Sequence, residues 1–343
     1  ISGFTLGGAK DVRKALMDLK ATGKLKRVVI DLRGNGGGIL DEAVEVVSLF
    51  VPKGTMVVYS KGKLPQMDMK YYTKEEPVDL KIPLAVLVNS SSASSSEIVA
   101  GALQDLDRAT IIGTRTFGKG LVQSIRDVGY NDKIKLTTAK YYIPSGRCVQ
   151  AIDYSHRNPD GSVGYIPDSL TKAFKTVNKG RTVYDGGGVT PDVAMKQEQY
   201  SRAAVSLVYN DILHTYSVKY YKEHNSIDSP EKFVLTDAEY EDFVSFAAGR
   251  EFDHRTATEV EFDQLLSLAK KEGLYDGIKD KIDSLEKSVK LSKSEVLRKN
   301  KGEIKSLLEE EICNRYYYQK GRIASIIRND DVLQAAAKAV FVN

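Results

Sequence analysis

An apolar run that ends in a cluster of serines constrains this chain more than any other feature. Leu84 to Val88 is short, wholly apolar and contains two valines, which is typical of a buried strand. The apolar residues that follow the cluster recur at helical spacing: Ile98, Val99, Ala102 and Leu103. The stretch therefore predicts a strand, a tight turn and a helix, with Ser90 to Ser96 at the helix N-terminus.

This position has a chemical consequence for the serine cluster. The first N–H groups of a helix have no partner inside the helix, and the helix dipole is positive there, so the turn favours an anion such as an oxyanion. A purely structural interpretation also exists, because Ser94-Ser95-Ser96-Glu97 fits the capping box S-x-x-E and Ser94 would then only cap the helix.

A lysine follows in the second half of the same stretch. Thr110 to Gly113 predicts another short strand, and in the loop after it Lys119 stands between Gly118 and Gly120. A lysine can deprotonate a serine hydroxyl only when it is itself neutral, which requires burial. Two alternatives remain open, a solvated loop cation and a phosphate contact, although the P-loop pattern does not occur here.

A glycine-rich loop is the second chemical feature. Arg27 to Leu32 predicts a short apolar strand, and DLRGNGGG at residues 31 to 38 leads out of it. Consecutive glycines let the backbone approach a ligand closely, so that their N–H groups point into a site. Alone, such loops are common and say little about function.

Together these segments resemble the C-terminal processing peptidases, also called tail-specific proteases, which are serine peptidases with a Ser-Lys dyad. The resemblance rests on VNSSSASSSEIVAGALQD, on GTRTFGKGLVQ and on DLRGNGGG. It implies that Ser94 is the nucleophile, that Lys119, 25 residues further on, is the base, and that Gln123 orients the lysine. Three nearby serines are alternative nucleophiles: Ser92, Ser95 and Ser96. Only the register of the motif favours Ser94 over them. The family pattern also differs here at Ser90, Ser91 and Ser95.

The resemblance carries further expectations about the site and the fold. It implies an oxyanion hole made by the backbone N–H of Gly37, with Gly38 as the near alternative, and by that of Ser95. It implies an α/β core of the crotonase/ClpP-like layered type, a mechanism without metal or cofactor, and a location in the bacterial periplasm or cell envelope. Family members usually carry a PDZ domain, and neither it nor a signal peptide is visible in a chain that begins at Ile1, so we expect a fragment or processed form.

The composition changes near Lys196, which predicts two domains. We expect residues 1–195 to form the peptidase core, with a surface loop over 153–184 and a closing segment over 184–193. Residues 196–343 predict an all-helical domain, since Thr236 and Thr256 open capping boxes and Lys/Glu-rich helical stretches follow. Such a region is usually a solvated scaffold, and a homo-oligomer contact or an adaptor platform is the alternative.

Composition excludes several other classes of protein. The 343 residues carry a formal net charge of only +4, which gives no case for nucleic acid, and no apolar run approaches the roughly 20 residues of a membrane span. Cys148 and Cys313 have no metal-ligand spacing. The histidines lie outside the central stretch, so no Ser-His-Asp site is indicated: His156, His214, His224 and His254.

The sequence therefore predicts a serine endopeptidase that acts on protein or peptide substrates at or near their C-terminal regions. A catalytically silent peptide-binding or scaffolding module on the same fold is the main alternative. An acyl-CoA enzyme of related architecture is a third, but it gives no reason for a Ser-Lys pair.

Overall fold

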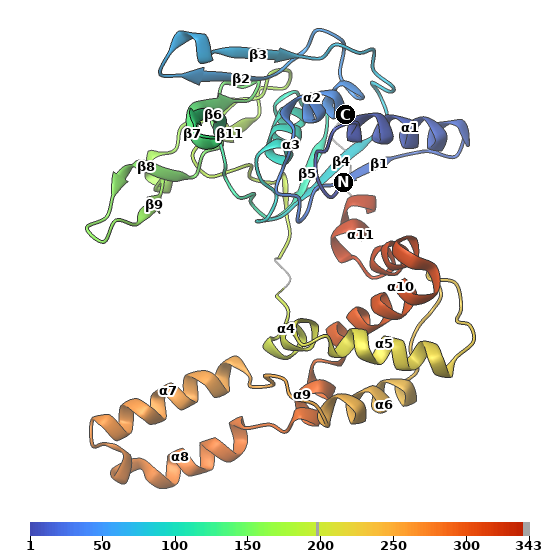
Figure 1. The fold of residues 1–343 in the computed structure, drawn as a ribbon, viewed down its shortest axis with the longest axis vertical. Coiled ribbons are helices and arrows are strands. Elements are labelled where there is room, and N and C mark those ends of the chain that lie inside the picture. The colour runs from blue at the N-terminus through green and yellow to red at the C-terminus, as the bar shows by residue number, and fades with distance from the viewer. Residues whose placement is uncertain (197–198, 339–343) are drawn as a thin grey trace. The chain divides into compact units, whose positions relative to one another are not determined.

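The computed structural model describes residues 1–196 and 199–338, which form two compact units (Figure 1). Within the described residues, the first unit contains 1–196 and 331–338, and the second contains 199–330. Each unit has its own apolar core. The layered α/β core followed by a helical region is the architecture that the sequence predicts, and this expectation is confirmed.

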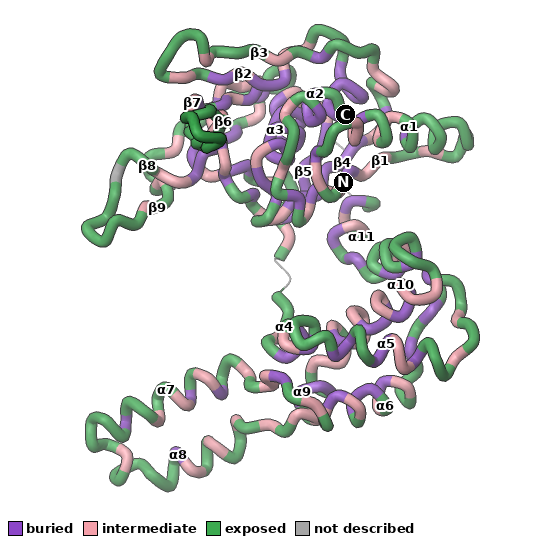
Figure 2. The backbone as a smooth tube through the Cα atoms, in the orientation of Figure 1, coloured by how far each residue is buried: buried purple, intermediate pink, exposed green. Residues whose placement is uncertain are grey.

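A four-stranded parallel sheet lies at the centre of the first unit. Its strands, in spatial order, are β1 (Val28–Asp31), β4 (Leu84–Val88), β5 (Thr110–Gly113) and β12 (Val193–Ala194). All residues of β4 and β5 are buried (Figure 2), because both faces of the sheet are covered. Burial on both faces explains why Leu84 to Val88 is a continuous apolar run rather than an alternating one.

Successive residues of β4 point to opposite faces, and each face has its own cover. Leu84, Val86 and Val88 join the main core, in which the apolar faces of three helices also lie. These helices are α1 (Gly8–Ala21), α2 (Leu40–Ser48) and α3 (Ser95–Asp105).

The other face is covered by a helix from the far end of the chain. α11 (Asp331–Lys338) places Val332 and Ala336 against Ala85, Leu87 and Ile112. The sequence assigns this helix to the helical domain expected over residues 196–343, whereas in the structure it packs within the first unit. Val332 and Ala336 are four residues apart, so they share one helical face, and that face fills the open side of the sheet.

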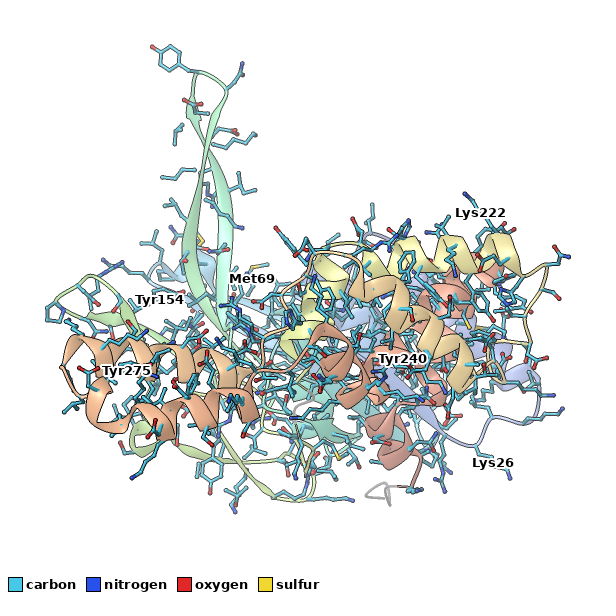
Figure 3. The ribbon with its side chains drawn as sticks, turned by 90° about the horizontal axis from the view of Figure 1, so that it is seen from below. Lys26, Met69, Tyr154, Lys222, Tyr240 and Tyr275 are labelled. Atoms are coloured by element: carbon cyan, nitrogen blue, oxygen red, sulfur yellow. The ribbon has the colours of Figure 1, made fainter. Side chains whose placement is uncertain are left out.

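A second, antiparallel sheet flanks the core in the order β3-β2-β7-β6. Its strands are β2 (Met56–Gly62), β3 (Met69–Tyr72), β6 (Leu121–Gly129) and β7 (Asp132–Tyr142), and a 3-10 turn, η1 (Pro65–Met67), lies between β2 and β3. β6 and β7 continue beyond the sheet as a hairpin that projects into solvent (Figure 3).

Residues 153–184 contain more regular structure than the expected surface loop. Two small antiparallel pairs occur there, one of β8 (Ile152–Arg157) with β9 (Val163–Tyr165) and one of β10 (Ala173–Lys175) with β11 (Thr182–Tyr184), and η2 (Asp168–Leu170) lies between them. These strands are short and mostly exposed, so the sequence carries little apolar alternation to signal them.

The second unit is helical throughout its regular elements. Its helices are α4 (Arg202–Tyr209), α5 (Ile212–Glu223), α6 (Asp237–Ala248), α7 (Ala257–Lys271), α8 (Tyr275–Val289), α9 (Lys293–Lys299) and α10 (Lys301–Arg328). Thr236 and Thr256 cap α6 and α7 by accepting the N–H groups of Glu239 and Glu259, as the sequence predicts. α10 is interrupted at Tyr318, whose φ of 57° and ψ of −159° are not helical.

None of the helices within 1–196 and 199–338 is both long enough and apolar enough to cross a membrane.

Ala336→Glu tests whether α11 is an integral part of the first unit. Ala336 is fully buried against the sheet, so a carboxylate there would have no partner, and we expect the free energy of unfolding to fall by roughly 3 kcal/mol. Urea denaturation measures this change. The exposed neighbour Gln334→Glu is the control, and equal stability of the two variants would show that α11 does not cover the sheet.

Glu310 gives the second unit a pH-dependent stability. Its side chain is 13% exposed, burial raises its pKa to about 7, and Arg322, 3.8 Å away across the interruption in α10, only partly offsets this effect. The folded pKa therefore lies above the unfolded value, so the stabilising contribution is complete below about pH 4.5 and is lost as the pH rises through 7.

We expect wild-type stability to fall between pH 5 and pH 8, relative to Glu310→Gln, by up to about 3 kcal/mol. Urea midpoints of both proteins at the two pH values measure the difference. Glu251→Gln, at a side chain that is 99% exposed, should follow the wild type. Parallel behaviour of wild type and Glu310→Gln would contradict the assignment.

Candidate active site

Three loops follow the carboxyl ends of three neighbouring parallel strands. The glycine-rich loop (32–38) follows β1, the serine loop (89–94) follows β4 and the lysine loop (114–120) follows β5. Because parallel strands end at the same edge of a sheet, the topology brings together the three segments that the sequence singles out.

Ser94 occupies a distinctive backbone position in the serine loop. It is the N-cap of α3 and has φ 57° and ψ −115°, a conformation that is strained for a residue with a side chain. The residue is partly exposed, whereas Ala93 and Ser95 on either side of it are buried. Ser94 is therefore accessible at the start of the helix.

The rival serines have structural partners in the glycine-rich loop. Ser92 donates to Leu32 O (2.8 Å), Ser95 to Gly38 O (2.9 Å) and Ser96 to Asn35 O (2.9 Å). All three are at most 1% exposed. Their hydroxyl groups join the two loops, which leaves Ser94 as the serine of this group with access to solvent.

The glycine-rich loop lies directly against the start of α3. A Cβ at Gly37 would lie 2.8 Å from both Ala93 O and Ser94 Cβ, so only glycine permits this approach. The N–H of Gly37, however, donates to Asn35 Oδ1 at 2.8 Å. This hydrogen bond occupies the donor that the sequence favours for the oxyanion hole.

The N–H group of Gly38 is better placed than that of Gly37 to donate to an oxyanion. Phe4 and Gly38 form one isolated parallel bridge, in which the N–H of Phe4 donates to Gly37 O and the N–H of Ile39 donates to Phe4 O. The N–H and C=O of Gly38 therefore face away from Phe4, and its C=O accepts the hydroxyl of Ser95. Within the described residues neither Gly38 N–H nor Ser95 N–H donates to another group.

Glu97 connects the serine loop to the lysine loop. Its Oε2 accepts the N–H groups of Ser94 (2.9 Å) and Lys119 (2.8 Å), and its Oε1 accepts the hydroxyl of Thr116 (2.6 Å) and the N–H of Gly118 (2.7 Å). The residue is fully buried. Burial raises the pKa of Glu97, and these four donors oppose the rise by stabilising the carboxylate.

Tyr141, on β7, makes a second connection between the same two residues. Its hydroxyl donates to the carbonyl oxygens of both Ser94, at 3.2 Å, and Lys119. Burial, together with the negative charge of Glu97, raises the pKa of Tyr141 well above its usual value, so the phenol keeps the proton that it donates. The backbones of Ser94 and Lys119 are thus linked on both their N–H and C=O sides.

The glycines beside Lys119 let its loop pack closely on residues 149–151. A Cβ at Gly118 would lie 2.3 Å from Ala151 Cβ, and one at Gly120 would lie 2.7 Å from Gln150 N. Lys119 is only partly exposed. Gln123 is exposed on β6, and the two residues line one cavity together with Gln150 and others.

The closing segment expected over 184–193 packs on the lysine loop. Thr116 and Val189 form two hydrogen bonds with each other: Thr116 N–H donates to the backbone oxygen of Val189, and Val189 N–H donates to the side-chain Oγ1 of Thr116. Thr116 in turn donates to Glu97. The segment supports the site from behind without contributing a reactive group.

The sequence singles out Ser94, Lys119 and Gln123, which stay predictions, and it does not indicate Glu97 and Tyr141 as organising residues. Glu97 was visible only as the third helical residue of a capping box, and that signal accounts for its bond to Ser94 N–H alone. Nothing in the sequence around Tyr141 distinguishes it from other strand tyrosines.

A strained, accessible serine at a helix N-terminus, beside free backbone N–H groups and a lysine loop, has the parts that a serine-type peptidase site requires. Residues 1–160 match the family model of peptidase family S41, and residues 203–340 match that of the probable PDZ-protease C-terminal helical domain. The part of the chain that carries the site is therefore similar to peptidase family S41.

Individual relatives agree with this assignment. The chain is 47% identical over 152 residues to the carboxy-terminal-processing protease of Bartonella bacilliformis, a match that covers 43% of this chain and 35% of that protein. It is 40% identical over 144 residues to the carboxyl-terminal-processing protease of Synechocystis sp., covering 42% and 33%. The matched region thus spans about a third of these relatives.

Among solved structures, the photosystem II D1 C-terminal processing protease is similar, with a TM-score of 0.43 and 28% identity, covering 57% of this chain and 41% of that one.

Glu97→Gln tests whether this carboxylate organises the site. The amide has one oxygen, so two of the four donors would face its NH₂ group, and we expect the free energy of unfolding to fall by roughly 3 kcal/mol. Urea denaturation of this variant and of the exposed control Glu45→Gln measures the effect. Wild-type stability in Glu97→Gln would show that the four hydrogen bonds do not hold the loops together.

Proposed function

We propose that this chain is a serine endopeptidase that cleaves proteins at or near their C-terminal regions through Ser94 and Lys119. The observation that carries the proposal is that one buried oxygen, Glu97 Oε2, accepts the N–H groups of both residues. A shared acceptor holds the two backbones in a fixed relation, which a nucleophile and its base require.

In the proposed reaction, Ser94 Oγ attacks the scissile carbonyl while neutral Lys119 takes the hydroxyl proton. The N–H groups of Gly38 and Ser95 stabilise the oxyanion of the tetrahedral intermediate. Lys119 then returns the proton to the leaving amine, which yields an acyl-enzyme. Water attacks this ester while Lys119 takes its proton, and the C–Oγ bond then breaks as Lys119 returns the proton to Ser94 Oγ and the new carboxyl terminus leaves.

Gln123 is proposed as a positioning residue for Lys119, because both line the same cavity. The helical unit is proposed as a scaffold or an interaction platform for an adaptor or a second copy. The substrate class follows the names of the relatives, which process carboxyl termini. A location in the bacterial periplasm or cell envelope is proposed from the family resemblance alone.

The competing function is a peptide-binding module without turnover. The arrangement around Ser94 favours the peptidase, because backbone strain at an accessible serine has no use in a site that only binds peptides.

Ser94→Ala and Lys119→Ala should each lower kcat/KM for an unstructured protein substrate by at least about 10⁴-fold, because each removes a reacting group. Cleavage by the chain and its variants is followed by mass spectrometry of the products. Ser91→Ala, in an exposed serine of the same loop, and Lys135→Ala, in an exposed hairpin lysine, are the matched controls and should retain wild-type rates.

Two outcomes would contradict the proposal. Full activity of the Ser94→Ala variant would exclude Ser94 as the nucleophile. Saturable peptide binding by the wild type without any product would favour the binding module instead.

A further inference from the structure

A groove lies beside the candidate active site, on the second sheet. It is lined by residues of β2, β6 and β7 and by the segment around β8, among them Lys61, Lys63, Lys140, Leu121, Ile152 and Ile166. The labelled Tyr154 lies near the base of the projecting hairpin (Figure 3). The groove belongs entirely to the first unit.

This groove continues into the cavity that contains Lys119. Gln123, Gln150, Ile152 and two further residues line both spaces. A polypeptide bound across the candidate active site can therefore extend into the groove without leaving the surface of the unit.

Three lysines give the groove a positive charge. Lys61 on β2 and Lys140 on β7 are directly opposite each other in the antiparallel register, and Lys63 follows directly after the end of β2. Like charges in directly opposed positions destabilise a strand pair. A protein that keeps two lysines in such a pair places positive charge there at a cost in stability.

Within the described residues, no carboxylate forms an ion pair with these three lysines. The ammonium groups of Lys61, Lys63 and Lys140 form no ion pair or hydrogen bond with any residue in the described part of the chain. Lys61 only lies over the ring of Tyr59, with its Nζ 5.7 Å from the ring centroid. Asp153 is the one acidic residue of the groove lining, and its Oδ1 accepts the N–H of Ser155 at 2.9 Å.

The remaining lining suits a side chain with an apolar stem. Leu121, Ile152 and Ile166 supply apolar surface, and the lysines supply the charged groups. A glutamate matches both features, because its methylene groups can lie on the apolar residues while its carboxylate pairs with an ammonium group.

We propose that this groove is a subsite for an acidic side chain, glutamate in particular, of the polypeptide substrate. This inference rests on the proposed peptidase function, because only a peptidase would bind the polypeptide in the groove as a substrate. Lys61 and Lys140 are its specificity-determining residues, and the substrate class becomes polypeptides with an acidic residue near the cleaved bond.

Binding tests the subsite independently of turnover. Pairs of fluorescent peptides are compared, each pair with Glu or Gln at one position near a chosen peptide bond and otherwise identical. The Ser94→Ala protein is titrated into each peptide, and fluorescence anisotropy gives the Kd values. We expect the Glu peptide to bind about 10-fold more tightly at one position in low salt, and this preference to shrink at high salt.

The lysine variants identify the source of the preference. In Lys61→Gln/Lys140→Gln the ratio of the two Kd values should fall to about one, whereas Lys135→Gln, on the hairpin outside the groove, should keep the wild-type ratio. Thermal melting of the double variant should show no loss of stability, because the substitution removes a like-charge pair.

A wild-type ratio near one at every position, or a ratio that survives in the double variant, would overturn the subsite. The wild-type protein, which keeps Ser94, then separates the subsite proposal from the peptidase proposal when kcat/KM is measured for the Glu and the Gln peptides. Cleavage without a Glu preference would reject the subsite and keep the peptidase, and a Glu preference in binding without cleavage would reject the peptidase and keep the groove as an acidic-peptide site.

Discussion

The carboxylate of Glu97 is the interaction on which the rest of the site depends. Four donors from two loops converge on it in a fully buried position: two come from Ser94 and Lys119 and two from Thr116 and Gly118. A buried carboxylate is tolerated only when donors replace its water, so the fold must keep both loops closed around it. The buried carboxylate of Glu97 thereby fixes the backbone position of Ser94 relative to that of Lys119.

The parallel sheet makes this convergence possible. β1, β4 and β5 are neighbours, so the loops that leave their carboxyl ends share one edge although they are tens of residues apart in sequence. The strands are held in place by cores on both faces, and α11 supplies one of them from the far end of the chain. The candidate site is thus formed by loops that a buried sheet holds in place.

Much of this organisation was predictable from local signals. The apolar run at Leu84–Val88, the serine cluster and the Gly-Lys-Gly segment each indicate their own structure, because strand burial, helix capping and glycine freedom are properties of a few adjacent residues. Other features were not predictable. The N–H of Gly37 donates to Asn35 Oδ1, a hydrogen bond that only the folded loop reveals. The packing of α11 on the sheet depends on Val332 and Ala336, whose partners lie more than 200 positions away in the sequence.

The sequence by itself determined the type and order of the elements around Ser94 and the similarity of residues 1–160 to peptidase family S41, because hydrophobic periodicity and motif spacing are properties of consecutive residues. Only the tertiary structure decided which serine is accessible, which glycine N–H remains free and that Glu97, Tyr141 and the lysines of the groove lie beside the site. These properties depend on which groups meet across the sheet edge, and burial and hydrogen-bond occupancy exist only after distant segments have packed together.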